Sequence, residues 1–201
     1  MVRSRAPRAR RSCRSRLAAI VLAIGLVGVG AGGAAACGGP AGPLHYTNAT
    51  YGISIRVDRR LTEWRTASAG SAFEVSFVDT AGTIAGGQHL DALTVSLAGT
   101  GATPPGQQAA LTSALTSLGT TMVAKLGTNP QVGTVSDVSL NGLTGVVVPY
   151  AVTVAGHPVV GWLYLLTAAG HIYALNAGAT AASWSTYRPI FTRAIASFRA
   201  R

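Results

Sequence analysis

Short segments in which apolar and polar side chains alternate follow one another from residue 45 onward. In YGISIRV, the apolar residues Ile53, Ile55 and Val57 alternate with Ser54 and Arg56. The segments FEVSFV and LTVSL repeat this pattern, with Phe73, Val75, Phe77, Leu93, Val95 and Leu97 in the apolar positions. Because successive side chains of a strand point to opposite faces, the alternation predicts half-buried strands of an antiparallel sheet.

Four longer strands are predicted in the second half of the chain, in VGTVSDVSL, TGVVVPYAVTV, VVGWLYLL and HIYALNAG. Asn141 and Gly142, between the first two, are a strong hairpin signal, and turns are expected at residues 155–158 and 168–170. Pro149 lies inside the second of these strands and cannot donate a ladder hydrogen bond. That strand is therefore expected at a sheet edge, or bulged at the proline.

Two segments have helical spacing. The first follows Pro104 and Pro105, is closed by Gly127, and carries one apolar stripe: Leu111, Leu115, Leu118, Met122 and Leu126. The second carries Trp184, Tyr187, Phe191, Ile195 and Phe198. Pro189 lies within it, so the helix begins near Arg188 or is kinked there. Three strands, a helix, four strands and a helix predict an α+β fold: an αβα sandwich with a mainly antiparallel central sheet flanked by amphipathic helices.

The start of the chain has the order of a secretory signal. Residues 1–16 contain seven arginines and no acidic residue, and the apolar stretch LAAIVLAIGLVGV follows. Three alanines then precede Cys37. A positive start, an apolar segment and small residues before a cut are the features of a signal peptide. The positive charges hold the start on the cytoplasmic side of the membrane.

Cys37 stands where the apolar run gives way to GGPAGP, and three outcomes are open. Cleavage before a lipidated Cys37 gives a lipoprotein with acyl chains such as palmitate, cleavage after Ala36 without lipidation gives a soluble secreted protein, and no cleavage gives a signal anchor. The lone cysteine and the flexible tether after it favour lipidation, although Ala34 stands where leucine is usual. We predict a signal peptide over residues 1–36, a Gly/Pro tether over 37–44 and one domain over 45–201.

The formal net charge of +10 does not indicate a nucleic-acid partner. Seven of the 16 basic residues lie in the first 16 positions, which leaves nine basic against six acidic residues in the rest of the chain. A nucleic-acid-binding domain keeps its basic footprint in the folded part. Both cysteines, Cys13 and Cys37, precede the predicted domain. This position excludes a disulfide framework, a cysteine zinc site and a cysteine nucleophile from the domain.

Several motifs of the predicted domain resemble those of PsbP-like domains. They are the opening YGISIRVDRRLTEW, the hairpin LNGLTGVVVPY, the strand pair GWLYLLTAAGHIYALNAGA and the terminal helix end IASFR. The resemblance covers about residues 46–199 and is closest in appearance to actinobacterial lipoproteins of the LpqN type. It implies an αβα sandwich, an exported setting and a non-enzymatic accessory or binding role. Trp64 and the matching turn and helix-end positions are expected to carry the fold.

No constellation of catalytic or metal-ligating residues stands out. The four histidines lack HxH or HxxxH spacing, and no G-x-S-x-G motif is present. His89 and Asp91, two positions apart, are interpreted as a solvated strand start rather than as metal ligands. We therefore expect no enzyme activity, no metal and no cofactor.

The segment DRRLTEWR is a candidate binding patch. Arg59, Arg60 and Arg65 surround Trp64 and could present a basic, aromatic-edged surface to anionic lipid headgroups or an acidic partner. The alternative is a set of solvated arginines beside a core tryptophan.

Three functions compete. The first is a non-catalytic binding or accessory domain, held at the outer face of the bacterial membrane by a lipid, that binds an envelope protein or an amphiphilic ligand. The second is the same domain secreted in soluble form, and the third is a cell-envelope hydrolase. A concave apolar groove between helix and sheet favours a ligand, a fully packed sandwich favours a protein partner, and a hydrolase requires clustered titratable side chains in a cleft.

Overall fold

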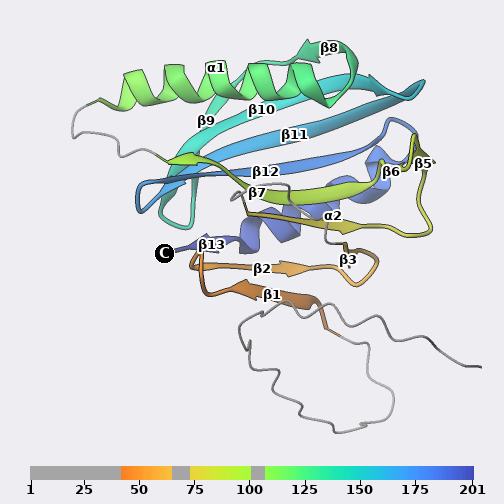
Figure 1. Ribbon diagram of the computed structural model, residues 1–201, viewed down its shortest axis with the longest axis horizontal. Coiled ribbons are helices and arrows are strands. Elements are labelled where there is room, and N and C mark those ends of the chain that lie inside the picture. Colours follow the sequence, from red (N-terminus) through yellow and green to blue (C-terminus); the bar gives the residue numbers. More distant parts are fainter. Residues whose placement is uncertain (1–41, 65–72, 101–106) are drawn as a thin grey trace, which may run out of the picture. The chain divides into compact units, whose positions relative to one another are not determined.

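The computed structural model describes residues 42–64, 73–100 and 107–201, among which lie the helices α1 (Gln108–Leu126) and α2 (Trp184–Ser197) (Figure 1). The strands before α1 are β1 (Leu44–Asn48), β2 (Ile53–Val57), β3 (Thr62–Trp64), β4 (Glu74–Val78), β5 (Ile84–Ala85), β6 (Gln88–His89) and β7 (Ala92–Thr100). The strands after it are β8 (Thr128–Val132), β9 (Ser136–Leu140), β10 (Leu143–Val154), β11 (His157–Ala168), β12 (His171–Thr180) and β13 (Arg199–Ala200).

The described strands form one large sheet and two small ones, and their pairings are antiparallel. The large sheet has the order β3-β4-β7-β12-β11-β10-β8, and β9 also pairs with β10. One small sheet has the order β1-β2-β13, and the other is the β5-β6 hairpin. Neither helix of the described residues combines the length and apolar character needed to span a bilayer.

Tight two-residue turns connect the long strands. In each turn, a residue other than glycine and the glycine after it both have positive φ, as a type I′ turn requires. The pairs are Asn141 (56°) and Gly142 (85°), Ala155 (45°) and Gly156 (85°), and Ala169 (48°) and Gly170 (76°). The hairpin predicted at Asn141 and Gly142 and the two later turns are confirmed.

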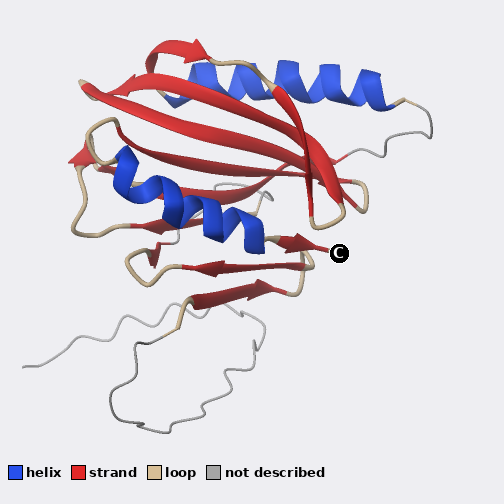
Figure 2. Cartoon of the chain, turned by 180° about the vertical axis from the view of Figure 1, so that it is seen from behind, coloured by secondary structure: helices blue, strands red, loops and turns tan. Residues whose placement is uncertain are grey.

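The large sheet separates two hydrophobic cores. One core joins the sheet to α2 and the β1-β2-β13 sheet, and its buried side chains include Phe77, Tyr173 and Phe191. The other joins the sheet to α1 and includes Leu115 and Leu163. Figures 1 and 2 show α1 and α2 on opposite faces of the sheet. The predicted α+β sandwich is therefore confirmed.

Helix α1 packs through a stripe slightly different from the predicted one. Leu115, Gly119 and Val123 are buried, whereas the other predicted stripe residues are partly exposed. Gly127 follows α1 in extended backbone (φ −178°) rather than in the left-handed conformation of a typical C-terminal glycine. A Cβ there would lie 2.5 Å from the Thr153 carbonyl oxygen. Glycine is therefore needed for the close approach to β10.

The element order differs from the prediction in several places. Among the described residues, seven strands precede α1, five lie between the helices, and β13 follows α2. Helix α2 begins at Trp184, so Pro189 lies inside it rather than at its start. Trp64, expected in the core, is 48% exposed at the end of β3.

Pro149 lies where the neighbouring ladder is interrupted. Strand β10 pairs with β9 up to Val147 and with β8 from Tyr150 onward, so Pro149 falls between the two partners. Its carbonyl accepts a hydrogen bond from Gly133 N at 2.8 Å on this side. The expected irregularity is thus a gap between the two partner strands of β10. Proline has no backbone N–H, and at this gap no ladder hydrogen bond from it is needed.

Candidate functional site

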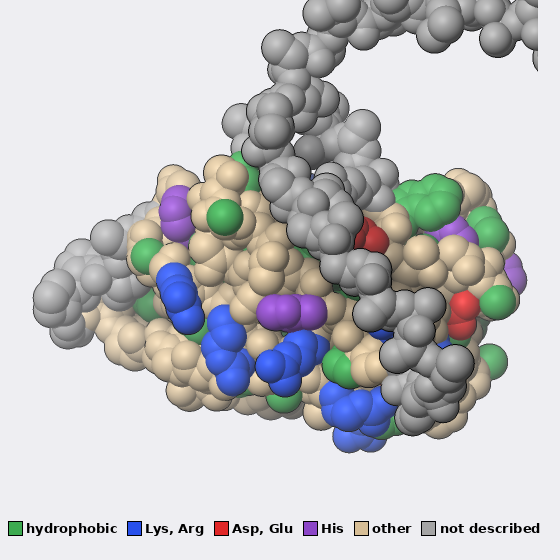
Figure 3. Space-filling model, turned by 90° about the horizontal axis from the view of Figure 1, so that it is seen from below, with side chains coloured by type: hydrophobic (Ala, Val, Ile, Leu, Met, Phe, Trp, Pro, Cys, Tyr) green, Lys and Arg blue, Asp and Glu red, His purple; other side chains and the backbone are tan. Residues whose placement is uncertain are grey.

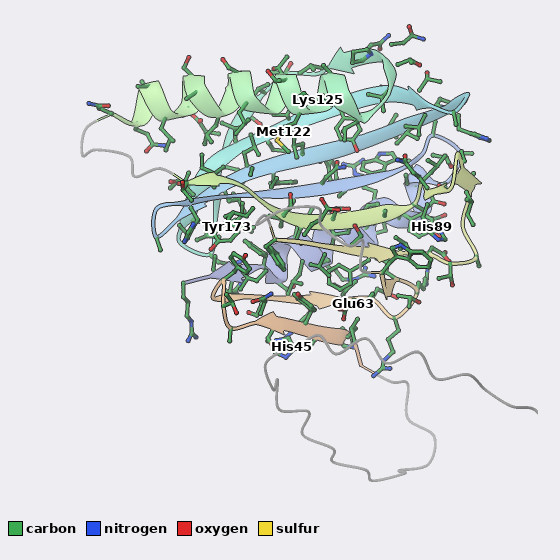
Figure 4. All side chains as sticks on the ribbon, in the orientation of Figure 1. His45, Glu63, His89, Met122, Lys125 and Tyr173 are labelled. Atoms are coloured by element: carbon green, nitrogen blue, oxygen red, sulfur yellow. The ribbon has the colours of Figure 1, made fainter. Side chains whose placement is uncertain are left out.

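A groove of about 400 Å³ lies between α1 and the large sheet. Its floor is formed by β4, β7, β12, β11 and β10, and one wall by Met122 and Leu126 of α1. The β5-β6 hairpin, through residues 87–89, and Trp64 of β3 form the opposite rim. Figure 4 shows Met122 below α1 on the side of the sheet, and His89 at the far end of the site beside β6.

The groove exists because α1 covers one part of the sheet. The helix packs on β10, β11 and β8. It approaches β10 closely at Gly119, where a Cβ would lie 2.7 Å from Val148 Cγ2 and 3.3 Å from Leu165 Cδ1. Strands β4 and β7 therefore carry a stretch of the sheet face beyond the helix, and this stretch lines the groove.

A row of polar side chains crosses the groove floor. Ser76 of β4 is paired with Thr94 of β7, which is paired in turn with Asn176 of β12. The Ser76 and Thr94 hydroxyls form a hydrogen bond of 2.8 Å with each other. The Tyr150 hydroxyl donates to Asn176 Oδ1, also at 2.8 Å. The described residues offer no partner to the Asn176 amide nitrogen, which can therefore donate to a bound molecule.

Tyr150 lies across the sheet over two glycines. A Cβ at Gly161 or at Gly178 would lie 2.6 Å from the Tyr150 hydroxyl oxygen. These glycines leave room for the side chain of Tyr150, which is a buried residue. Burial raises the pKa of Tyr150 above its usual value, so the phenol stays protonated at neutral pH and donates to Asn176.

The side chains at the α1 end of the groove are apolar. They come from α1, β10 and β11, and they are Met122, Leu126, Val152, Val154, Val159 and Leu163. Glu74 lines the groove on the side of β4, and none of the described lining residues is a lysine or arginine. The groove is therefore amphipathic, with hydroxyl, amide and carboxylate groups at one end and aliphatic groups at the other.

The sequence-predicted patch is divided by the structure. Trp64 lies on the groove rim with its ring 5.2 Å from that of His89, in an edge-to-face arrangement. Arg59 and Arg60 are exposed in the β2–β3 turn, and neither lines the groove. Arg59 Nε donates to the Gly42 carbonyl at 2.5 Å. Arg65 lies outside the described residues, and so do Ala36 and Cys37.

Asp91 is not solvated, contrary to the interpretation from sequence. It is 2% exposed. Its buried carboxylate accepts hydrogen bonds from Thr180 N at 3.0 Å and from Ser183 Oγ at 2.5 Å. These partners lie about 90 residues further along the chain, where the sequence gives no signal of the contact. No group of three or more potential metal ligands occurs among the described residues.

Sequence analysis missed the polar row on the groove floor, because each of its members looked like an ordinary strand position. Ser76, Thr94 and Asn176 alternate with apolar neighbours as solvent-facing residues do. The pairing of β4, β7 and β12 brings them together. The hydroxyls of Ser76 and Thr94 bond to each other, which differs from the serine–histidine hydrogen bond of an activated nucleophile.

The architecture is an αβα sandwich with a PsbP-like fold, as the sequence motifs implied. No protein-family model and no curated protein matches the chain. Among solved structures, cyanobacterial PsbP (CyanoP) from Synechocystis sp. PCC 6803 is similar over 86% of this chain and 100% of its own, with a TM-score of 0.61 and 14% identity. This likeness shows the fold.

Two further solved structures are similar at lower scores. LpqN of Mycobacterium tuberculosis, described as involved in cell envelope biogenesis, has a TM-score of 0.42 and 14% identity, over 73% of this chain and 81% of its own. The Ran-binding protein Mog1p of Saccharomyces cerevisiae has a TM-score of 0.48 and 9% identity, over 79% and 95%. Their described roles are properties of those proteins.

Proposed function

We propose that this protein is an exported, non-catalytic accessory lipoprotein that binds an amphiphilic small molecule in the groove. The observation that carries the proposal is the groove itself, whose apolar end and polar row lie side by side on one sheet face. A volume of about 400 Å³ lies within the range of small-molecule pockets, which is roughly 300–1,000 Å³. A fully packed sandwich would instead have favoured a protein partner.

The lining indicates the chemistry of the ligand. The aliphatic side chains of α1, β10 and β11 can cover an acyl chain or a ring system and remove it from water. The Asn176 amide nitrogen and the Ser76–Thr94 hydroxyl pair can bond to a head that carries hydroxyl or amide groups. The described lining residues include no lysine or arginine that could pair with an anionic head. A neutral head is therefore favoured over an anionic one.

The ligand proposal is tested with a neutral fluorescent probe, N-phenyl-1-naphthylamine, and two competitors of equal chain length. Monoolein has a neutral head, and oleate has a carboxylate. We expect the probe to bind to the chain that begins at residue 37, and monoolein to displace it at least tenfold more effectively than oleate. Ser96→Phe places a bulky ring in the groove from β7 and should abolish binding. Thr100→Phe, at the exposed end of the same strand, is the matched control.

Three outcomes would overturn the ligand proposal. They are no probe binding, full binding by Ser96→Phe, or equal displacement by the two competitors. Thermal unfolding of both variants separates a blocked groove from a failed fold.

The membrane tether is the second part of the proposal. Its support is the signal-like start of the chain, the small residues before Cys37 and the Gly/Pro segment after it. The test is the intact mass and membrane partitioning of the mature protein expressed in an actinobacterial host, beside Cys37→Ser. We expect a chain that begins at Cys37 and carries a diacylglyceryl group. An unmodified soluble chain cut after Ala36 would show secretion instead.

A further inference from the structure

We infer that the outer face of the β1-β2-β13 sheet docks onto an anionic phospholipid surface. The basic face is defined by His45, Ser54, Arg56, Ser197 and Arg199, which line a shallow depression of about 170 Å³. It is separate from the groove and shares no lining residue with it. It is also distinct from the DRRLTEWR patch.

Strand alternation directs Arg56 and Arg199 outward. On β2, Ile53, Ile55 and Val57 are buried in the core, so Ser54 and Arg56 point to the other side. His45 of β1 is paired with Arg56, and Arg199 of β13 is paired with Ser54. Figure 3 shows lysine and arginine side chains gathered around a histidine on the face seen from below. Figure 4 places His45 at the outer side of β1.

The charges of the basic face are not neutralised within the described part of the chain. Neither Arg56 nor Arg199 forms an ion pair there, and the nearby Asp58 carboxylate is 3.4 Å from the guanidinium of Arg193. Arg199 Nη1 donates to the Phe198 carbonyl at 2.9 Å, which holds the guanidinium in place. Its remaining N–H groups can bond to phosphate oxygens, an interaction for which arginine is well suited.

The position of the face on the chain favours a membrane over a soluble anion. Strand β1, which carries His45, begins at Leu44, seven positions after Cys37. Seven extended residues span at most about 25 Å. A lipid on Cys37 would therefore keep this face within reach of the leaflet, and this step rests on the proposed tether. The groove opens on the α1 face of the large sheet, whereas the small sheet packs on the opposite face.

The inference is tested by vesicle co-sedimentation of the chain from residue 37 with Cys37→Ser, which carries neither lipid nor the arginines of residues 1–16. Both cores and all the described strand pairings lie within this chain. Vesicles of 30% phosphatidylglycerol in phosphatidylcholine are compared with pure phosphatidylcholine at low salt. A basic residue near an anionic surface contributes about fivefold to binding. We therefore expect Arg56→Gln to weaken binding about fivefold, and its combination with Arg199→Gln about 25-fold.

Lys125→Gln is the matched control, because it removes one exposed positive charge from α1. It should change vesicle binding less than twofold. The inference is overturned if Lys125→Gln weakens binding as much as Arg56→Gln, if neutral vesicles bind equally well, or if the chain binds inorganic phosphate but not vesicles. Arg56 has no side-chain hydrogen bond among the described residues, so its single variant remains informative if the double variant does not fold.

The lipid-free chain separates this inference from the proposed function. Vesicle binding by the Cys37→Ser chain stands even if Cys37 proves to be unmodified in the cell. Its failure leaves both the groove and the tether untouched.

Discussion

The carboxylate of Asp91 is expected to be one of the largest single polar contributions to stability in this domain. It lies between the end of β12 and the start of α2, where Oδ1 accepts from Thr180 N and Ser183 Oγ. Oδ2 accepts from Thr83 N at 3.3 Å. The perturbation is Asp91→Ala, with Asp91→Asn as the variant that keeps an acceptor oxygen.

The contacts set the size of the effect. The Ser183 hydroxyl also forms a hydrogen bond of 2.7 Å with Thr180 Oγ1. Losing its hydrogen bond to Asp91 therefore costs little. The Thr180 amide is buried, and a hydrogen bond to a charged group contributes about 1.5–3 kcal/mol. Helix α2 has no acidic residue in its first turn, so the nearby negative charge adds about 0.3–1 kcal/mol. Asp91→Ala should therefore lower the free energy of unfolding by about 2–4 kcal/mol, and Asp91→Asn by about 1 kcal/mol.

Urea unfolding of the chain from residue 37, followed by tryptophan fluorescence, measures both variants. Asp137→Ala is the control, because Asp137 is exposed and accepts a 3.1 Å hydrogen bond from Thr112 Oγ1. It should cost less than about 0.5 kcal/mol. The reasoning is refuted if Asp91→Ala costs no more than Asp137→Ala, or if Asp91→Asn costs as much as Asp91→Ala.

Three further outcomes follow from the sheet. Burial raises the pKa of Tyr150 above its value in the unfolded chain. The contribution of Tyr150 to the free energy of unfolding is therefore fully present below pH 10 and is lost as pH rises above that value. In urea unfolding between pH 9 and 11, the free energy of unfolding of the wild type should fall by up to about 1.4 kcal/mol per pH unit more than that of Tyr150→Phe. In Gly178→Ala, the added Cβ would clash with the Tyr150 hydroxyl. In Gly161→Ala, it would also clash with the backbone carbonyl of Ala177. A double-mutant cycle should therefore show Tyr150→Phe rescuing the former variant and not the latter. Asn141 donates from Nδ2 to two carbonyls at the end of α2 and has a φ of 56°. Asn141→Gly should cost about 1–3 kcal/mol through the lost hydrogen bonds, and Asn141→Ala about 1 kcal/mol more, as measured by unfolding.

The features predicted correctly from sequence are those that local chemistry determines. Glycine after a residue that tolerates positive φ fixed the hairpin at Asn141, and apolar spacing identified both helices. Alternation identified the long strands. Strand β8 was missed because all five of its residues are exposed, which leaves no alternation to detect.

The groove could not be predicted from the sequence pattern, because the pattern does not show which strands pair. Ser76, Thr94 and Asn176 are distant in the chain, and only strand pairing places them in one row. Trp64 was expected in the core from the family resemblance, and the DRRLTEWR motif also placed it in a candidate surface patch. Its position on the groove rim depends on β3 being the edge strand of the large sheet. Asp91 was misread for a related reason, because its partners come from the other end of the chain.

The small sheet has a consequence for the order in which the domain can fold. Its middle strand, β2, forms near the start of the domain, but its third strand, β13, consists of Arg199 and Ala200. A chain that crosses a membrane from its N-terminus therefore cannot complete this sheet until Arg199 and Ala200 have emerged. Contacts of such large sequence separation form slowly. Until then the β1-β2 hairpin would lack its third strand, and the pairing of β13 with β2 would be a late step in the folding of the domain.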